Sequence, residues 1–220
     1  VLSWGDYSYG QPSLLTAVCC AGDDGIINIE HEAGLSGEIY DKAVMIIEGF
    51  IRTVYSDRFN MSFRASLCFE QSYGIIDGDS ASAAEIYALL SAVTGIPLRQ
   101  DIAVTGSVNQ FGEIQAVGGV REKVAGFFKI CEHRGLSGTQ GVIIPETNID
   151  NLLLPDEILE AVSKGLFHIY PIRTVNEGLE ILTGMAAGEK DAEGKFPEGS
   201  FNAKAVSCFR ELSEKLKENK

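Results

Sequence analysis

Two short stretches of the sequence carry residue types that can cleave an acyl bond. Asp77-Gly78-Asp79-Ser80-Ala81-Ser82 places a serine in a tight turn that leads into a predicted helix. Gly118-Gly119-Val120-Arg121-Glu122-Lys123 places a lysine one turn into another predicted helix. A serine hydroxyl becomes a nucleophile when a neighbouring base takes its proton, and a neutral amine is such a base. If Ser80 and Lys123 meet in the fold, the protein is a hydrolase that needs no histidine, metal or cofactor.

The neighbours of both residues suit this chemistry. Gly78 and the small residues after Ser80 leave the backbone N–H groups of the first helical turn uncovered, so a substrate carbonyl can approach them. Lys123 is followed by Val124 and Phe127, and burial among apolar side chains lowers the pKa of a lysine.

Each residue also has an ordinary structural interpretation. Serine is a favoured helix N-cap, and the acidic residues Asp77 and Asp79 are favourable near a helix N-terminus. Lysine is mostly found on protein surfaces. The local sequence leaves both interpretations open for Ser80 and for Lys123.

Other chemistries find little support. The histidines His31, His133 and His168 have no recognisable triad context, and the Ser80 turn is not Gly-x-Ser-x-Gly. There is no Gly-x-x-x-x-Gly-Lys-[Ser/Thr] loop, so nothing in this chain is expected to bind ATP. A net charge of −13 disfavours a nucleic-acid partner. No apolar run reaches the roughly 18 residues of a membrane span.

The cysteines and the N-terminus suggest where the protein acts. The five cysteines are odd in number and form no Cys-x-x-Cys pair. We expect them to be reduced and mostly buried, which is typical of a cytoplasmic protein. The chain begins at Val1 without a signal-peptide pattern and without an initiator Met, so we expect a fragment of a longer protein.

Hydrophobic periodicity and turn residues predict a series of alternating elements. We expect strands at 13–20 and 25–30, paired as a hairpin through the turn at 21–24, then a helix over 39–54 that Ser36 caps. The next predicted elements are a strand at 62–69, a helix at 80–94, a strand at 101–108 and a short return strand at 114–117. The last are a helix at 121–133, a strand at 141–145 buried on both faces, a helix at 156–164, a strand at 166–170 and a helix at 175–182.

This order predicts an α+β fold, in which an N-terminal β-hairpin is followed by alternating strands and helices around a mixed sheet. Residues 1–184 form the expected catalytic domain. Residues 185–220 comprise a predicted linker, rich in glycine and charge, and an amphipathic helix that begins at Phe201. This helix can pack on the domain or on a neighbouring subunit.

Longer motifs around the two reactive residues resemble one family. The segment Gln71-Ser72-Tyr73-Gly74-Ile75-Ile76-Asp77-Gly78-Asp79-Ser80-Ala81-Ser82 looks like the serine motif of Lon proteases, in their LonB-like branch. The segment from Thr105 to Lys123 looks like the stretch that leads to the family's lysine, and Gly141–Asn148 is similar to a further family segment. The resemblance runs from about residue 10 to residue 184.

The resemblance implies a Lon proteolytic-domain fold and a Ser–Lys dyad. Ser80 aligns with the nucleophile, Lys123 with the general base, and Thr105 with a threonine that orients the lysine amine. The implied activity is a serine endopeptidase that cleaves unfolded proteins through an acyl-enzyme. The family also implies an AAA+ ATPase module, with its ATP site, elsewhere in the full-length chain, and assembly into a hexameric ring.

The sequence departs from the commonest Lon pattern at three positions. Asp79 stands where proline is usual, Ser82 where glycine is usual, and Glu85 where an aliphatic residue is usual. A carboxylate on the Lys123 amine would raise the lysine pKa and block the base. We therefore consider an inactive arrangement in which Asp79 turns inward. Two other functions stay open: a catalytically silent domain kept for assembly, and a small-molecule hydrolase or amidase that uses the same dyad.

Overall fold

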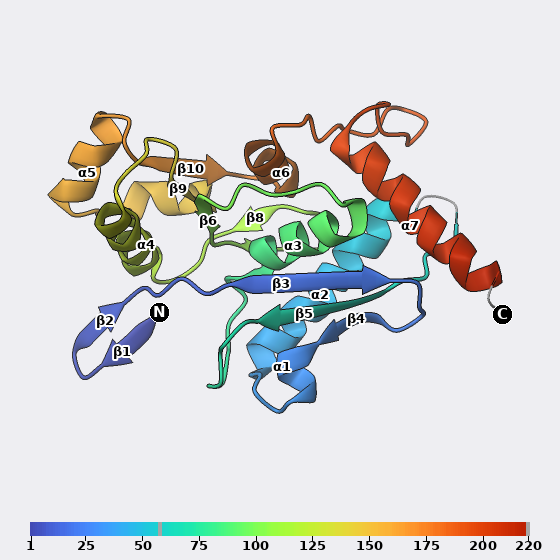
Figure 1. Cartoon of the computed structure of the whole chain (residues 1–220), viewed down its shortest axis with the longest axis horizontal. Coiled ribbons are helices and arrows are strands. Elements are labelled where there is room, and N and C mark those ends of the chain that lie inside the picture. Colours follow the sequence, from blue (N-terminus) through green and yellow to red (C-terminus); the bar gives the residue numbers. More distant parts are fainter. Residues whose placement is uncertain (57–58, 219–220) are drawn as a thin grey trace.

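The structure is a computed structural model that describes residues 1–56 and 59–218, apart from the side chain of Trp4. Within these residues the chain combines helices with four small sheets (Figure 1), so the expected α+β class is confirmed. Two of the sheets have three strands each, and helices supply most of the buried residues of the core around them.

The first sheet has the order β3-β5-β4 and is mixed. Its strands are β3 (Leu15–Cys20), β4 (Gly25–Asn28) and β5 (Arg64–Phe69). β5 pairs antiparallel with β3 and parallel with β4. The predicted hairpin of residues 13–30 is therefore wrong, because β5 lies between the two strands. β5 offers its buried residues Ala65 and Leu67 to the core, and this burial stabilises the central position.

The second sheet has the order β10-β9-β6 and is parallel. It comprises β6 (Ile102–Val104), β9 (Gly141–Pro145) and β10 (His168–Ile172). Every residue of β9 is buried, as predicted from its short apolar run. The crossover connections carry α4 (Val120–Arg134), the 3₁₀ helix η1 (Glu146–Asn151) and α5 (Asp156–Ser163).

Two hairpins complete the strands. One joins β1 (Leu2–Trp4) to β2 (Tyr7–Tyr9), and the other joins β7 (Ser107–Val108) to β8 (Ile114–Gln115). The second confirms the predicted return strand. The predicted strand at 101–108 is not continuous, because Thr105 and Gly106 separate β6 from β7, and the two halves join different sheets.

The remaining elements are helices. They are α1 (Ile29–Glu32), α2 (Glu38–Tyr55), α3 (Ser82–Thr94), α6 (Val175–Thr183) and α7 (Phe201–Glu218). α2 begins after Gly37, which provides no side-chain cap, so the predicted Ser36 cap is wrong. The carboxylate of Asp77 instead accepts hydrogen bonds from the N–H groups of Ile39 and Tyr40.

The C-terminal helix shares the core of the first sheet. Phe201, Ala205 and Phe209 of α7 are fully buried, and Phe209 contacts the rings of Tyr55 and Phe63. In Figure 1, α7 lies across α2 at the end of the molecule opposite the N-terminal hairpin. Residues 185–200 before it contain no helix or strand.

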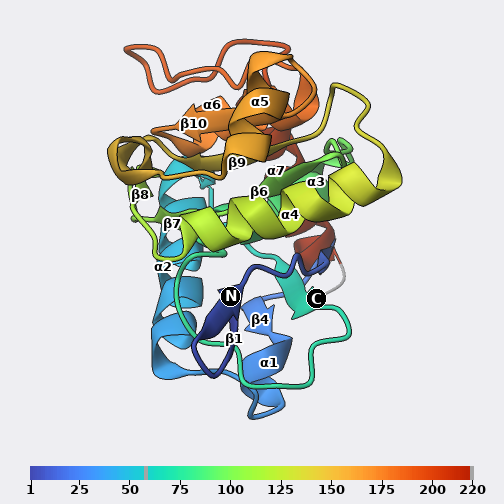
Figure 2. The ribbon, with the colours of Figure 1, turned by 90° about the vertical axis from the view of Figure 1, so that its left-hand side faces the viewer.

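The N-terminal segment packs closely on α4. A Cβ atom added to Gly126 would lie 2.0 Å from the carbonyl oxygen of Gly10, so the two backbones touch only because both residues are glycine. Figure 2 shows α4 between the layer of β9 and β10 and the N-terminal hairpin. The helix that carries Lys123 is thus held from both sides.

The next two observations concern the thiols and the lengths of the helices. All five cysteines are free, but only Cys131 is buried and Cys20 is exposed, so the expectation of mostly buried thiols is wrong. In the part of the chain that the structure describes, no helix is both long and apolar enough to cross a membrane.

Candidate active site

Ser80 lies in the turn that leads into α3, and it does not cap that helix. The N-cap of α3 is Ala81, which makes no side-chain capping bond. Gly78 has a φ angle of +99°, a conformation that glycine adopts without strain, and this allows the tight turn before Ser80. The turn is closed by Ser82, whose N–H and hydroxyl both donate to the carbonyl oxygen of Asp79.

Lys123 points from the first turn of α4 toward this serine. Its Nζ lies 2.8 Å from Ser80 Oγ and 3.1 Å from Thr105 Oγ1. Lys123 is only partly buried, and Thr105 is 5% exposed. The structure therefore brings together the three side chains that the sequence singles out.

Thr105 connects the lysine to the nucleophile turn. It stands at the break between β6 and β7, where its N–H donates to the carbonyl oxygen of Ile143 in β9. Its hydroxyl donates to the carbonyl oxygen of Ser80 at 3.2 Å, and the N–H of Gly106 donates to the same oxygen at 2.8 Å. The break in the predicted strand is thus what aims Thr105 at the site.

Two opposing effects act on the amine. Burial lowers the pKa of Lys123 below that of a free lysine, because the charged form loses solvation. The negative charge of Asp79 acts in the opposite direction and raises the pKa. Burial is the larger of the two, so the net shift favours the neutral amine.

The carboxylate of Asp79 is bonded to a serine of β7. Its Oδ2 accepts a hydrogen bond from Ser107 Oγ at 2.8 Å, and Ser107 is 3% exposed in β7. The ion pairs found among residues 1–56 and 59–218 do not include one between Asp79 and Lys123. The inactive arrangement with Asp79 turned inward is therefore not the one in this structure. Ser107 is a residue that the sequence analysis missed, since a lone serine in a strand carries no signal.

Backbone donors lie beside the nucleophile. Within the described residues, the N–H groups of Asp79, Ser80 and Ala81 make no hydrogen bond. Unpaired donors next to a hydroxyl can bind a negatively charged oxygen that forms there.

A cavity of about 450 Å³ opens at the dyad. It is lined by the small side chains of Ala81, the N-cap of α3, and of Ala84 and Ala88 within that helix. Residues of β6 and of the segment 11–15 also line it, and most of the lining is apolar. No histidine is among the residues that line it.

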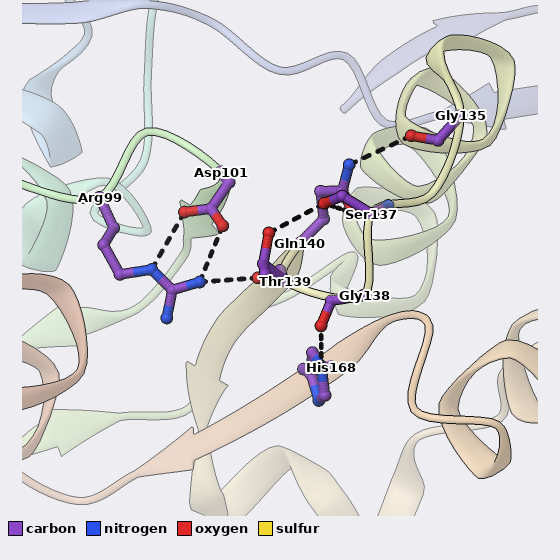
Figure 3. Close-up of polar contacts among 8 residues, drawn as sticks. All are labelled: Arg99, Asp101, Gly135, Ser137, Gly138, Thr139, Gln140 and His168. Carbon is purple, nitrogen blue, oxygen red and sulfur yellow. Dashed lines mark hydrogen bonds and ion pairs between the residues drawn. The ribbon is translucent and has the colours of Figure 1, made fainter.

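Arg99 lines this cavity and takes part in a polar network (Figure 3). Arg99 donates two hydrogen bonds to the carboxylate of Asp101 and one to the carbonyl oxygen of Thr139. In the same region, Nε2 of His168 lies 2.9 Å from the carbonyl oxygen of Gly138. The network joins the residues just before β6 to the loop before β9.

The described residues show no grouping of three or more His, Cys, Asp or Glu side chains that could hold a metal ion.

Comparison with known proteins identifies a matching family and several similar proteins. The family model described as Lon protease (S16) C-terminal proteolytic domain matches residues 74–184. Two proteins named "Putative Lon protease homolog" are similar to the chain, with 46% identity over 80% of it in Haemophilus influenzae and 44% over 86% in Escherichia coli K12. An "Archaeal Lon protease" of Archaeoglobus fulgidus is 35% identical over 65% of the chain. The chain spans 29% and 32% of the length of the two bacterial relatives, and 21% of the archaeal one.

Proposed function

Since the chain belongs to the family of Lon protease (S16) C-terminal proteolytic domains, we propose that it is a serine endopeptidase with Ser80 as nucleophile and Lys123 as general base. The observation that carries the proposal is the 2.8 Å contact between Lys123 Nζ and Ser80 Oγ. A base at hydrogen-bond distance from a hydroxyl is the geometry that nucleophilic catalysis requires.

Acylation begins with the neutral form of Lys123. Its amine takes the proton of Ser80 Oγ as this oxygen forms a bond to the scissile carbonyl carbon. The N–H groups of Ser80 and Ala81 donate to the resulting oxyanion. The C–N bond then breaks, Lys123 returns the proton to the departing amine, and an ester on Ser80 remains.

Deacylation repeats these roles with water. Lys123 takes a proton from the attacking water, the ester bond to Ser80 breaks, and Ser80 Oγ regains a proton from Lys123. Thr105 keeps the amine in place through both steps, because its hydroxyl contacts both Lys123 and the backbone of Ser80.

The apolar lining of the cavity favours an unfolded polypeptide as substrate. Folded proteins bury their large apolar side chains, whereas unfolded chains present them. A volume of about 450 Å³ also suits a small molecule, so a small-molecule amidase is the second candidate. Hydrolysis of simple esters without cleavage of casein would favour that candidate.

We also propose a role for the part of the protein that lies outside this chain. Because the chain spans about three tenths of its bacterial relatives, we propose that an AAA+ ATPase module in the same polypeptide binds ATP, unfolds substrates and assembles with this domain as a hexameric ring. The chain itself needs no cofactor in this scheme. The five free thiols suit a cytoplasmic location.

The test combines a fluorophosphonate probe, which acylates reactive serines, with cleavage of casein. Ser80→Ala and Lys123→Ala should each abolish labelling and cleavage. Ser163→Ala and Lys129→Ala are matched controls at exposed positions, the second on the same helix as Lys123, and should retain both. Full activity in Ser80→Ala or Lys123→Ala would refute the dyad, and an unlabelled parent protein would support a catalytically silent assembly domain.

A further inference from the structure

Tyr40 of α2 is hydrogen-bonded on both sides of Ser80, to Asp77 before it and to Glu85 in α3 after it. Its backbone N–H donates to Asp77 Oδ1 at 3.1 Å, and its hydroxyl donates to Glu85 Oε1 at 2.7 Å. Asp77 precedes Ser80 by three residues and Glu85 follows it by five. The backbone N–H and the hydroxyl of Tyr40 therefore both connect the segment around Ser80 to α2.

The side chain of Asp77 is held by N–H groups at the start of α2. The same Oδ1 accepts hydrogen bonds from the N–H groups of Ile39 and Gly78. A carboxylate at a helix N-terminus is favourable, because it meets unpaired donors and the positive end of the helix dipole. The side chain of a residue other than glycine at position 37 would overlap Asp77, so the approach is close.

The side chain of Glu85 lies in the core, where burial of a carboxyl group costs free energy of folding. The side chains of Glu85 and Tyr40 are 0% exposed, and Glu30 of α1 is 4% exposed nearby. In the described part of the chain, Oε2 of Glu30 and Oε2 of Glu85 each lack a hydrogen-bond partner. Burial, and then the charge of Glu30, raise the pKa of Glu85 to about 7 against the opposing effect of the Tyr40 hydrogen bond.

The groups that face this pair come from several elements. Asp41 of α2 and Glu30 act on Tyr40, and the thiol of Cys68 in β5 lies against Glu30. Oε1 of Glu30 accepts a hydrogen bond from the N–H of Phe69 at 2.8 Å. None of these neighbours is a cation. An apolar side chain at position 85 would pack at lower cost, so stability does not explain the acid.

We propose that Tyr40 and Glu85 are positioning residues that keep Ser80 Oγ within reach of Lys123. Their contacts anchor the N-terminal part of α3, and with it the turn before this helix, to α2. Because acylation requires the reacting atoms in near-contact geometry, a shift of a fraction of an ångström lowers the rate without removing any group from the site. This inference rests on the proposed function, since it concerns the nucleophile of that reaction.

The first test removes the hydroxyl of Tyr40. Tyr40→Phe should lower the rate of Ser80 acylation by about tenfold or more, with little change in KM for a peptide substrate. The matched control is Tyr55→Phe, in the same helix. Tyr55 is also fully buried, and its hydroxyl donates to Asn202 Oδ1 of α7 at 2.8 Å, far along the helix from Tyr40. Both variants lose a buried hydrogen bond, but only Tyr40→Phe should lose acylation rate.

The second test changes the acceptor. Glu85→Gln retains an oxygen that accepts from Tyr40 and should acylate at the parent rate, whereas Glu85→Leu should lose about as much rate as Tyr40→Phe. This pair decides the question if Tyr40→Phe does not fold.

Three outcomes separate the ideas. A folded Tyr40→Phe with the parent rate, or an equal loss in Tyr55→Phe, would overturn the positioning role. So would equal rates in Glu85→Gln and Glu85→Leu. None of these results bears on the dyad, which is tested by Ser80→Ala and Lys123→Ala and fails only if those variants remain active.

Discussion

The buried carboxyl of Glu85 predicts that the folded chain loses stability as the pH rises toward neutrality. Burial is the main cause that raises its pKa, from 4.5 for a free glutamate to about 7, and the charge of Glu30 adds to it. The unfolded chain exposes this side chain to water, so its pKa there returns to the ordinary value. The two states therefore release the same proton at different pH values.

The sign and size of the effect follow from this difference. Between 4.5 and about 7 the folded chain keeps a proton that the unfolded chain has released, so raising the pH favours unfolding. The stabilisation is complete below 4.5 and is lost as the pH passes through about 7. At about 1.4 kcal/mol for each pH unit, the full loss amounts to about 3 kcal/mol of unfolding free energy.

Urea unfolding of the parent and of Glu85→Gln measures this loss. Glutamine has no proton to release, and its amide oxygen still accepts from Tyr40. Between about pH 5 and about pH 8, the unfolding free energy of the parent should fall by about 2 to 3 kcal/mol more than that of Glu85→Gln. Other titrating groups act equally in both proteins and cancel in the comparison.

The control is Glu132→Gln, which removes a carboxyl group from an exposed position of α4 and should leave the pH dependence of the parent unchanged. The reasoning is refuted if the parent and Glu85→Gln lose the same free energy over this pH range, because Glu85 would then titrate as a solvated side chain.

Three further predictions concern the dyad and the C-terminal helix. Thr105→Val should lower fluorophosphonate labelling of Ser80 by about tenfold, because the Lys123 amine loses one of its two partners, and Thr105→Ser should restore it; equal rates in all three proteins would contradict this. Asp79→Asn should move the acidic limb of the pH–rate profile to lower pH, since the charge that raises the pKa of Lys123 is removed and the amine becomes neutral earlier; an unmoved limb would show that this charge does not reach the amine. Phe209→Ala should lower the unfolding free energy by about 3 to 5 kcal/mol in urea, because a fully buried ring is lost from the core; an unchanged midpoint would mean that α7 unfolds independently of the sheet.

Local patterns in the sequence were sufficient for most helices and for the central strand β9. The stripe of apolar residues in α2 and the Gly-Ile-Pro stop after α3 depend on neighbours within a few residues, so they can be read along the chain. The motifs around Ser80 and Lys123 resemble those of one family, and this resemblance implies a dyad. The residues alone left both Ser80 and Lys123 open to an ordinary structural interpretation, because a serine cap and a surface lysine are common.

Contacts between distant segments required the tertiary structure. β5 separates β3 from β4, although the short turn between these two strands predicts a hairpin, because pairing depends on which strand buries the most apolar surface. The carboxylate of Asp79 accepts a hydrogen bond from Ser107, which lies 28 residues further along the chain.

The sequence by itself thus determined which side chains are able to react and which segments form helices. Only the tertiary structure decided that Lys123 and Thr105 converge on Ser80, and that the hydroxyl of Tyr40 in α2 reaches Glu85 in α3. The physical reason is that a hydrogen bond requires two groups within about 3 Å, and the backbone path that brings them together is set by the packing of the whole core.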